Sequence, residues 1–107
     1  MLAESGLRAA GRWWAGKRSA DDPLVSPLGS RLDGLPPIDV YIGDRDILRP
    51  AVDRLVERVR SQDVDLHVHE VPAMFHVWMT RRIPEGRRTR RSLARLVAAR
   101  AAGSGPA

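Results

Sequence analysis

A strand, a helix and a second strand follow one another through the middle of the chain, and this order constrains the fold more than any other feature. The first strand is expected over residues 38–42, a run of β-branched and aromatic residues that ends at a glycine. A helix is expected over residues 50–61, because Pro50 suits a first helical position and valine and leucine then recur at helical spacing. The second strand is expected over Leu66–Val71, before a proline. Two strands joined by one helix form a right-handed parallel βαβ unit, so the sequence predicts an α/β fold.

The flanking segments predict two further helices and a long loop within a single partial domain over residues 1–107. We expect Trp13 and Trp14 to pack the first helix against the body of the domain. The expected elements are, in order, a helix at residues 1–16, a loop at 17–37, the βαβ unit with its loops at 38–82, a terminal helix at 83–101 and a disordered tail at 102–107.

The positive charge of the chain is concentrated in its last quarter. Residues 81–107 carry eight arginines against the single acidic residue Glu85. Their most common role is a solvated helix face, and binding of polyanions is the alternative. Aromatic residues do not alternate with these arginines, so we expect no specific nucleic-acid partner.

Composition excludes several classes of protein. The chain has no cysteine, which excludes disulfides and thiol catalysis, and it has no apolar run long enough for a membrane span. With no secretion signal at its start, the chain is expected to be cytoplasmic. His67 and His69 share one face of the second strand, but two ligands without a third make a poor metal site. We therefore expect neither a metal nor a cofactor.

Acidic and imidazole side chains follow the two expected strands. Asp44 and Asp46 lie in the turn after the first strand, and His76 lies in the loop after the second. Neighbouring parallel strands end at the same edge of a sheet, so these loops should lie together. A carboxylate that orients a histidine base is the supporting pair of a nucleophilic triad, whose third member should be a serine. Asp44 is interpreted as a surface or Arg45-paired carboxylate, and a turn or packing role for Asp46 and His76 remains the alternative.

Four motifs around these residues resemble those of a known family. They are Asp22-Pro-Leu-Val-Ser-Pro-Leu, Gly34-Leu-Pro-Pro, Gly43-Asp-Arg-Asp-Ile-Leu-Arg and Val71-Pro-Ala-Met-Phe-His-Val-Trp. Together they resemble the C-terminal third of the hormone-sensitive-lipase-like branch (fold-3) of the α/β-hydrolases, over about residues 13–101. The resemblance implies the C-terminal part of a three-layer sandwich, with two parallel strands and about three helices. It also implies Asp46 as the triad acid and His76 as the base, and Trp78 is interpreted as a wall of the substrate pocket.

Two motifs of that family do not occur in this chain. They are the Gly-x-Ser-x-Gly nucleophile motif and the His-Gly-Gly-Gly type oxyanion loop. The resemblance therefore implies an esterase or lipase that hydrolyses a short-chain acyl ester or lactone by a Ser-Asp-His triad whose serine lies outside this chain. We expect the chain alone to be inactive, and related esterases imply a homodimer through the last strand and helix. The alternative hypothesis is an inactive fragment or a basic module that binds polyanions.

Overall fold

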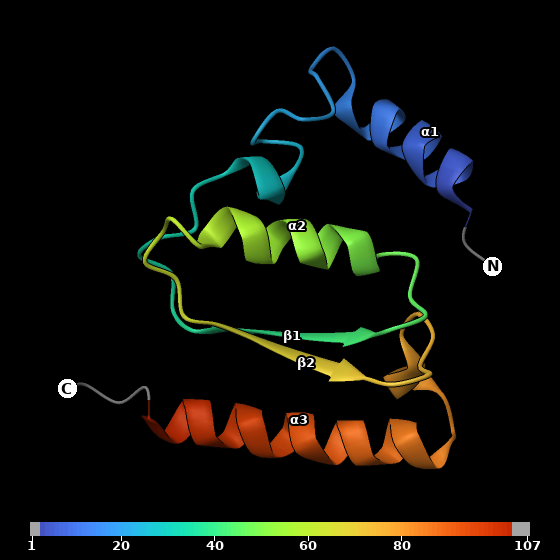
Figure 1. Cartoon of the computed structure of the whole chain (residues 1–107), viewed down its shortest axis with the longest axis vertical. Helices are drawn as coiled ribbons and strands as arrows, with labels where there is room; N and C mark the ends of the chain where they lie inside the picture. Colours follow the sequence, from blue (N-terminus) through green and yellow to red (C-terminus); the bar gives the residue numbers. More distant parts are fainter. Residues whose placement is uncertain (1–2, 104–107) are drawn as a thin grey trace. The chain divides into compact units, whose positions relative to one another are not determined.

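The computed structural model describes residues 3–103, which divide into two compact units (Figure 1). The first unit ends at His76 and the second begins at Val77. The first contains α1 (Glu4–Ala15), η1 (Pro27–Gly29), β1 (Ile38–Gly43), α2 (Arg49–Val59) and β2 (Leu66–Val71). The second contains η2 (Trp78–Thr80) and α3 (Pro84–Gly103).

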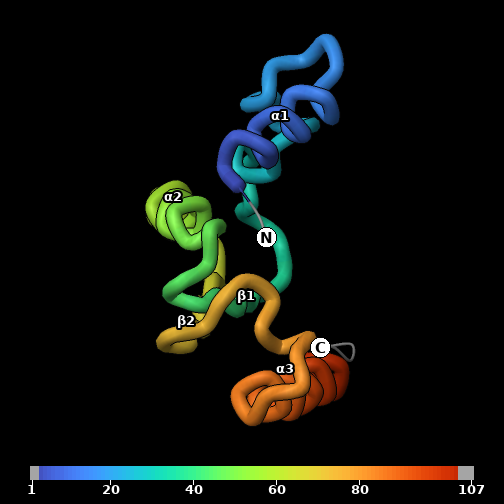
Figure 2. The backbone as a smooth tube through the Cα atoms, turned by 90° about the vertical axis from the view of Figure 1, so that its right-hand side faces the viewer, coloured from blue at the N-terminus to red at the C-terminus, as the bar shows by residue number. Residues whose placement is uncertain are grey.

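The first unit is built on the parallel pair of β1 and β2. Their register runs from Ile38 opposite Leu66 to Gly43 opposite Val71. The two strands lie side by side, with α2 over one face of the pair (Figures 1 and 2). Ile42 of the sheet is buried, as are two α2 residues, Val52 and Val59. The predicted α/β fold and parallel strand pair are confirmed.

The ends of the elements differ from the sequence-based expectations by one to three residues. The helix expected over residues 1–16 is α1, which begins at Glu4 after the extended Ala3 and ends at Ala15. β2 has the expected bounds, whereas β1 extends through Gly43. α2 begins one residue early and ends at Val59, because Arg60 closes the helix with a bond from its N–H to the carbonyl of Glu57. α3 continues to Gly103, and the rest of the expected tail lies outside the described residues. The single partial domain over residues 1–107 remains a prediction.

The expected packing of the two tryptophans of α1 is wrong. Trp13 is 90% exposed and Trp14 is 81% exposed, and the one buried residue of the helix is Ala15. Residues two positions apart lie on nearly opposite sides of a helix, so burial of Ala15 turns Trp13 outwards. α1 therefore presents its aromatic residues to its surroundings.

The second unit is organised around Trp78. This side chain is fully buried, and its Nε1–H donates a hydrogen bond of 3.0 Å to Oγ1 of Thr89 in α3. Gly86 is also buried, and a Cβ built on it would lie 2.8 Å from the carbonyl oxygen of Trp78. Trp78 is thus a core residue and not the pocket wall that the sequence suggested.

None of the helices that the structure describes is long and apolar enough to cross a membrane.

Candidate active site

Asp46 lies in a tight turn between β1 and α2. Its N–H donates to the carbonyl of Gly43 at 3.1 Å, which reverses the chain directly after the strand. Its carboxylate Oδ1 accepts the N–H of Leu48 at 2.9 Å, a contact typical of aspartate in turns. The side chain is only 5% exposed, so the turn holds a carboxylate in a nearly buried position.

His76 lies at the end of the loop that follows β2. The loop bends sharply at Ala73, whose φ of 60° is in the left-handed region that residues with a side chain seldom adopt. The Ala73 N–H donates to Oδ1 of Asp44 at 2.7 Å. Asp44 is exposed, as predicted, but its recorded partner is this backbone N–H and not Arg45. Its role in joining the two loops was missed, because a contact between residues this far apart in the chain leaves no local pattern.

A close approach of the two loops adds to this link. The Arg45 N–H donates to the carbonyl of Met74 at 3.1 Å, and the Asp44 N–H donates to that of Val71 at 3.3 Å. A Cβ built on Gly43 would lie 2.5 Å from the carbonyl carbon of Met74, which is closer than real Cβ atoms come. The contact therefore requires glycine at the end of β1.

The two loops bring Asp46 and His76 together. Both carboxylate oxygens of Asp46 lie 3.1 Å from Nδ1 of His76. An ionised carboxylate can only accept, so Nδ1 carries the proton and the lone pair of the neutral ring is on Nε2. The His76 side chain is 37% exposed, and all of its recorded hydrogen bonds within residues 3–103 involve Nδ1. The pair therefore has the geometry of an oriented general base.

A model of the alpha/beta hydrolase fold family matches residues 1–80. The chain belongs to the α/β-hydrolase family. This confirms the resemblance found in the sequence motifs, including its placement among the hormone-sensitive-lipase-like esterases and lipases.

The proteins that this chain resembles include an acetyl-hydrolase and a triacylglycerol lipase. This chain is 35% identical over 83 residues to an acetyl-hydrolase of Streptomyces hygroscopicus, and the matched region covers 76% of this chain and 27% of that relative. This chain is also 38% identical over 66 residues to a triacylglycerol lipase of Mycobacterium tuberculosis, and the matched region covers 62% of this chain and 15% of the lipase. The chain therefore spans less than a third of these relatives.

Solved structures of α/β-hydrolases agree with the fold. The crystal structure of an esterase/lipase from an uncultured bacterium has a TM-score of 0.73 at 24% identity, over 80% of this chain and 30% of that one. Another crystal structure, of an esterase, has a TM-score of 0.71 at 34% identity, over 86% of this chain and 28% of that one.

A second Asp–His pair of this hydrolase chain lies on the sheet itself. His69 Nε2 lies 2.9 Å from Oδ1 of Asp39, and its ring stacks on Tyr41 with centroids 4.4 Å apart. His67 pairs instead with Asp65, at 2.7 Å. No group of three metal-ligating side chains occurs among residues 3–103. Both histidines lie within β2 rather than after its carboxyl end; His69 makes cross-strand contacts that support the sheet, whereas His67 contacts a residue of its own segment.

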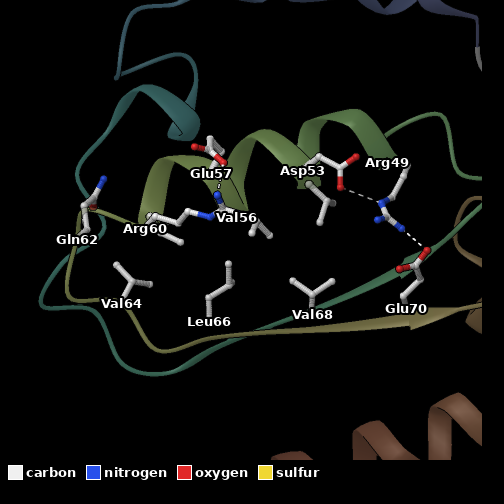
Figure 3. Close-up of a pocket in the computed structure, with 12 residues that line it drawn as sticks. Arg49, Asp53, Val56, Glu57, Arg60, Gln62, Val64, Leu66, Val68 and Glu70 are labelled. Carbon is white, nitrogen blue, oxygen red and sulfur yellow. Dashed lines mark hydrogen bonds and ion pairs between the residues drawn. The ribbon is translucent and has the colours of Figure 1, made fainter.

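A groove of the first unit is separate from the Asp46–His76 pair. It has a volume of about 840 Å³ and lies between α2 and β2 (Figure 3). Leu66 and Val68 of β2 point into it, and Arg49 lies at one end of it, bound to Asp53 and Glu70. Hydrogen bonds to these carboxylates, chiefly to Glu70, raise the pKa of the Arg49 guanidinium above its ordinary value. Neither Asp46 nor His76 lines this groove.

Proposed function

We propose that this chain supplies the acid and the base of a Ser-Asp-His triad in a carboxylic-ester hydrolase, and that the serine lies outside the chain. The observation that carries the proposal is the contact of both Asp46 oxygens with Nδ1 of His76 at 3.1 Å, at the carboxyl ends of two parallel strands. The names of the relatives, which include an acetyl-hydrolase and a triacylglycerol lipase, support an ester as substrate.

In this mechanism Nε2 of His76 takes the proton of the serine hydroxyl as its oxygen attacks the ester carbonyl. The protonated ring then gives this proton to the departing alkoxide, which leaves an acyl-enzyme. His76 next takes a proton from a water molecule, whose oxygen attacks the acyl carbonyl. The ring then returns this proton to the serine oxygen as the bond to the acyl group breaks, which releases the acid and restores the serine. Asp46 stays ionised throughout and stabilises the positive charge of the ring. A short-chain acyl ester or lactone is the proposed substrate.

A chimeric enzyme tests the proposal. The matching C-terminal part of the Streptomyces acetyl-hydrolase is exchanged for this chain, and hydrolysis of p-nitrophenyl acetate is measured. We expect activity in the chimera and a loss of about three to four orders of magnitude in kcat with His76→Ala or Asp46→Asn. An active chimera whose rate does not change with His76→Ala would refute the role of the base. Hydrolysis by the isolated chain, abolished by His76→Ala, would refute an external serine.

One observation favours a second function, binding of polyanions by α3. Arg87, Arg91 and Arg95 are exposed and follow one another at four-residue spacing, which places them in one row at about 6 Å intervals along the helix. Titration with inorganic polyphosphate at rising salt tests this function. Binding that weakens by about tenfold or more would support it, and no binding at low salt would refute it. The homodimer and the cytoplasmic location remain predictions, and size exclusion at two concentrations checks the first.

A further inference from the structure

The loop between β2 and His76 is short, and its course depends on Ala73. It comprises residues 72–75, and the φ of Ala73 is 60°, in the left-handed region. This conformation is unfavourable for alanine by itself, so neighbouring contacts must hold it. The position of His76 therefore depends on what binds the loop at Ala73.

Three hydrogen bonds join this loop and the end of β2 to the turn after β1. Two of them connect backbone groups, at 3.3 Å and 3.1 Å, so they need no particular side chain. The third runs from the Ala73 N–H to Oδ1 of Asp44 at 2.7 Å, the short distance expected when a carboxylate accepts a backbone N–H. Within the described part of the chain, it is the one recorded bond between a side chain and the backbone of this loop.

We propose that Asp44 is a positioning residue for His76 and that it holds the imidazole in place through the backbone of Ala73. The proposal rests on the function proposed above, in which His76 is the base. Asp46 orients the ring through Nδ1, whereas Asp44 fixes the loop that carries the ring, by a bond three residues before the histidine. Nε2 must come within about 2.6–3.2 Å of the serine oxygen to take its proton. A displacement of about 1 Å can lower a rate about a hundredfold, so a loosely held loop slows catalysis.

Two variants separate the hydrogen bond of Asp44 from its negative charge. Asp44→Ala removes both the charge and the acceptor of the Ala73 N–H, whereas Asp44→Asn removes the charge and keeps an acceptor oxygen. An effect of the charge on the imidazolium would be lost equally in both variants. Loss of position should appear in Asp44→Ala and be largely absent from Asp44→Asn.

Kinetics of the chimeric enzyme with p-nitrophenyl acetate test the proposal. For Asp44→Ala we expect kcat to fall about tenfold and KM to change less than about twofold, because His76 serves both acylation and deacylation and both steps slow together. Asp44→Asn should retain most of the wild-type kcat. Asp22→Ala is the matched control, because it loses a bond of the same kind in another exposed loop, from the Leu24 N–H at 2.9 Å, and an ion pair with Arg18. This control should keep the wild-type kcat.

NMR of the whole chain gives a second readout that does not need activity. The ¹⁵N shifts of the His76 imidazole report its contact with Asp46, because the carboxylate holds the neutral ring with its proton on Nδ1. This form should stay dominant in Asp44→Asn and give way to a mixture of both tautomers in Asp44→Ala.

The proposal is overturned if Asp44→Ala has the kcat or the imidazole shifts of the wild type. Equal losses of kcat in Asp44→Ala and Asp44→Asn would also overturn it, in favour of an effect of charge. If the chimera is inactive, or its rate does not change with His76→Ala, the proposed function has failed instead. The imidazole shifts then still decide whether Asp44 holds the ring in place.

Discussion

Both carboxylate oxygens of Asp46 lie 3.1 Å from Nδ1 of His76, although thirty residues separate the two along the chain. The parallel pairing of β1 and β2 closes this separation, because it places the ends of both strands at one edge of the sheet. The Asp44 carboxylate and the Met74 carbonyl then join the two loops through backbone N–H groups. The orientation of His76 is therefore a property of the sheet edge rather than of either loop alone.

Replacement of Asp46 should change the tautomer of His76. In wild type the neutral ring should carry its proton on Nδ1, because the carboxylate can only accept. An asparagine in the same place can donate, so Asp46→Asn should shift the proton towards Nε2. The ¹⁵N chemical shifts of the imidazole at neutral pH measure this change. Asp44→Asn is the control and should leave the tautomer unchanged, and a wild-type ring protonated on Nε2 would contradict the geometry.

Gly43→Ala should destabilise the first unit. The new Cβ would meet the carbonyl group of Met74, so either β1 or the His76 loop must move. We expect a loss of more than about 2 kcal/mol in the free energy of unfolding, measured with urea. Gly11→Ala in α1 is the matched control, since its Cβ meets nothing within 4 Å, and it should stabilise the chain by about 0.5–1 kcal/mol. Equal stability of Gly43→Ala and wild type would refute the close approach.

Asp44→Ala should loosen the His76 loop. The variant loses the acceptor of the Ala73 N–H, a hydrogen bond of 2.7 Å in an exposed position. We expect a cost of about 1 kcal/mol and faster hydrogen exchange at the Ala73 amide. Asp44→Asn keeps an acceptor oxygen and should retain most of the protection. If exchange at Ala73 is the same in wild type and Asp44→Ala, the bond does not hold the loop.

Thr89→Val should weaken the second unit through Trp78. The substitution nearly preserves the shape of the side chain but removes the acceptor of the buried indole N–H. An unsatisfied buried donor costs about 1–3 kcal/mol, so thermal unfolding should begin at a lower temperature. Thr89→Ser retains the hydroxyl and should keep the indole N–H hydrogen bonded in NMR spectra. A Thr89→Val variant as stable as Thr89→Ser would show that this bond contributes little.

The elements of the βαβ unit could be predicted because their signals are local. Helical spacing of the valines in α2 and the β-branched run of β1 are properties of neighbouring residues. The candidate pair Asp46 and His76 followed from their positions after the two strands, together with the family motifs. The structure brings the two side chains together, and their catalytic role remains a proposal.

The surroundings of each side chain could not be predicted in this way. Trp13 and Trp78 are the same residue type in similarly apolar segments, yet one is almost fully exposed and the other fully buried. Trp13 is exposed because α1 buries its opposite side, at Ala15. Trp78 is buried beside Thr89 of α3, whose hydroxyl accepts the indole N–H. His69 was considered as a metal ligand, but its register places it beside Tyr41 and near Asp39. Such neighbours depend on strand pairing, which short-range spacing does not reveal.

The sequence by itself determined the order of the elements, the parallel connection and the residue types at the ends of the strands, because these follow from local backbone preferences and from connectivity. The tertiary structure alone decided that Asp44 joins the two loops, that Gly43 meets Met74 and that the tryptophans of α1 face outwards. These features depend on contacts between distant residues, whose energies appear only when the backbone has brought them within a few ångströms.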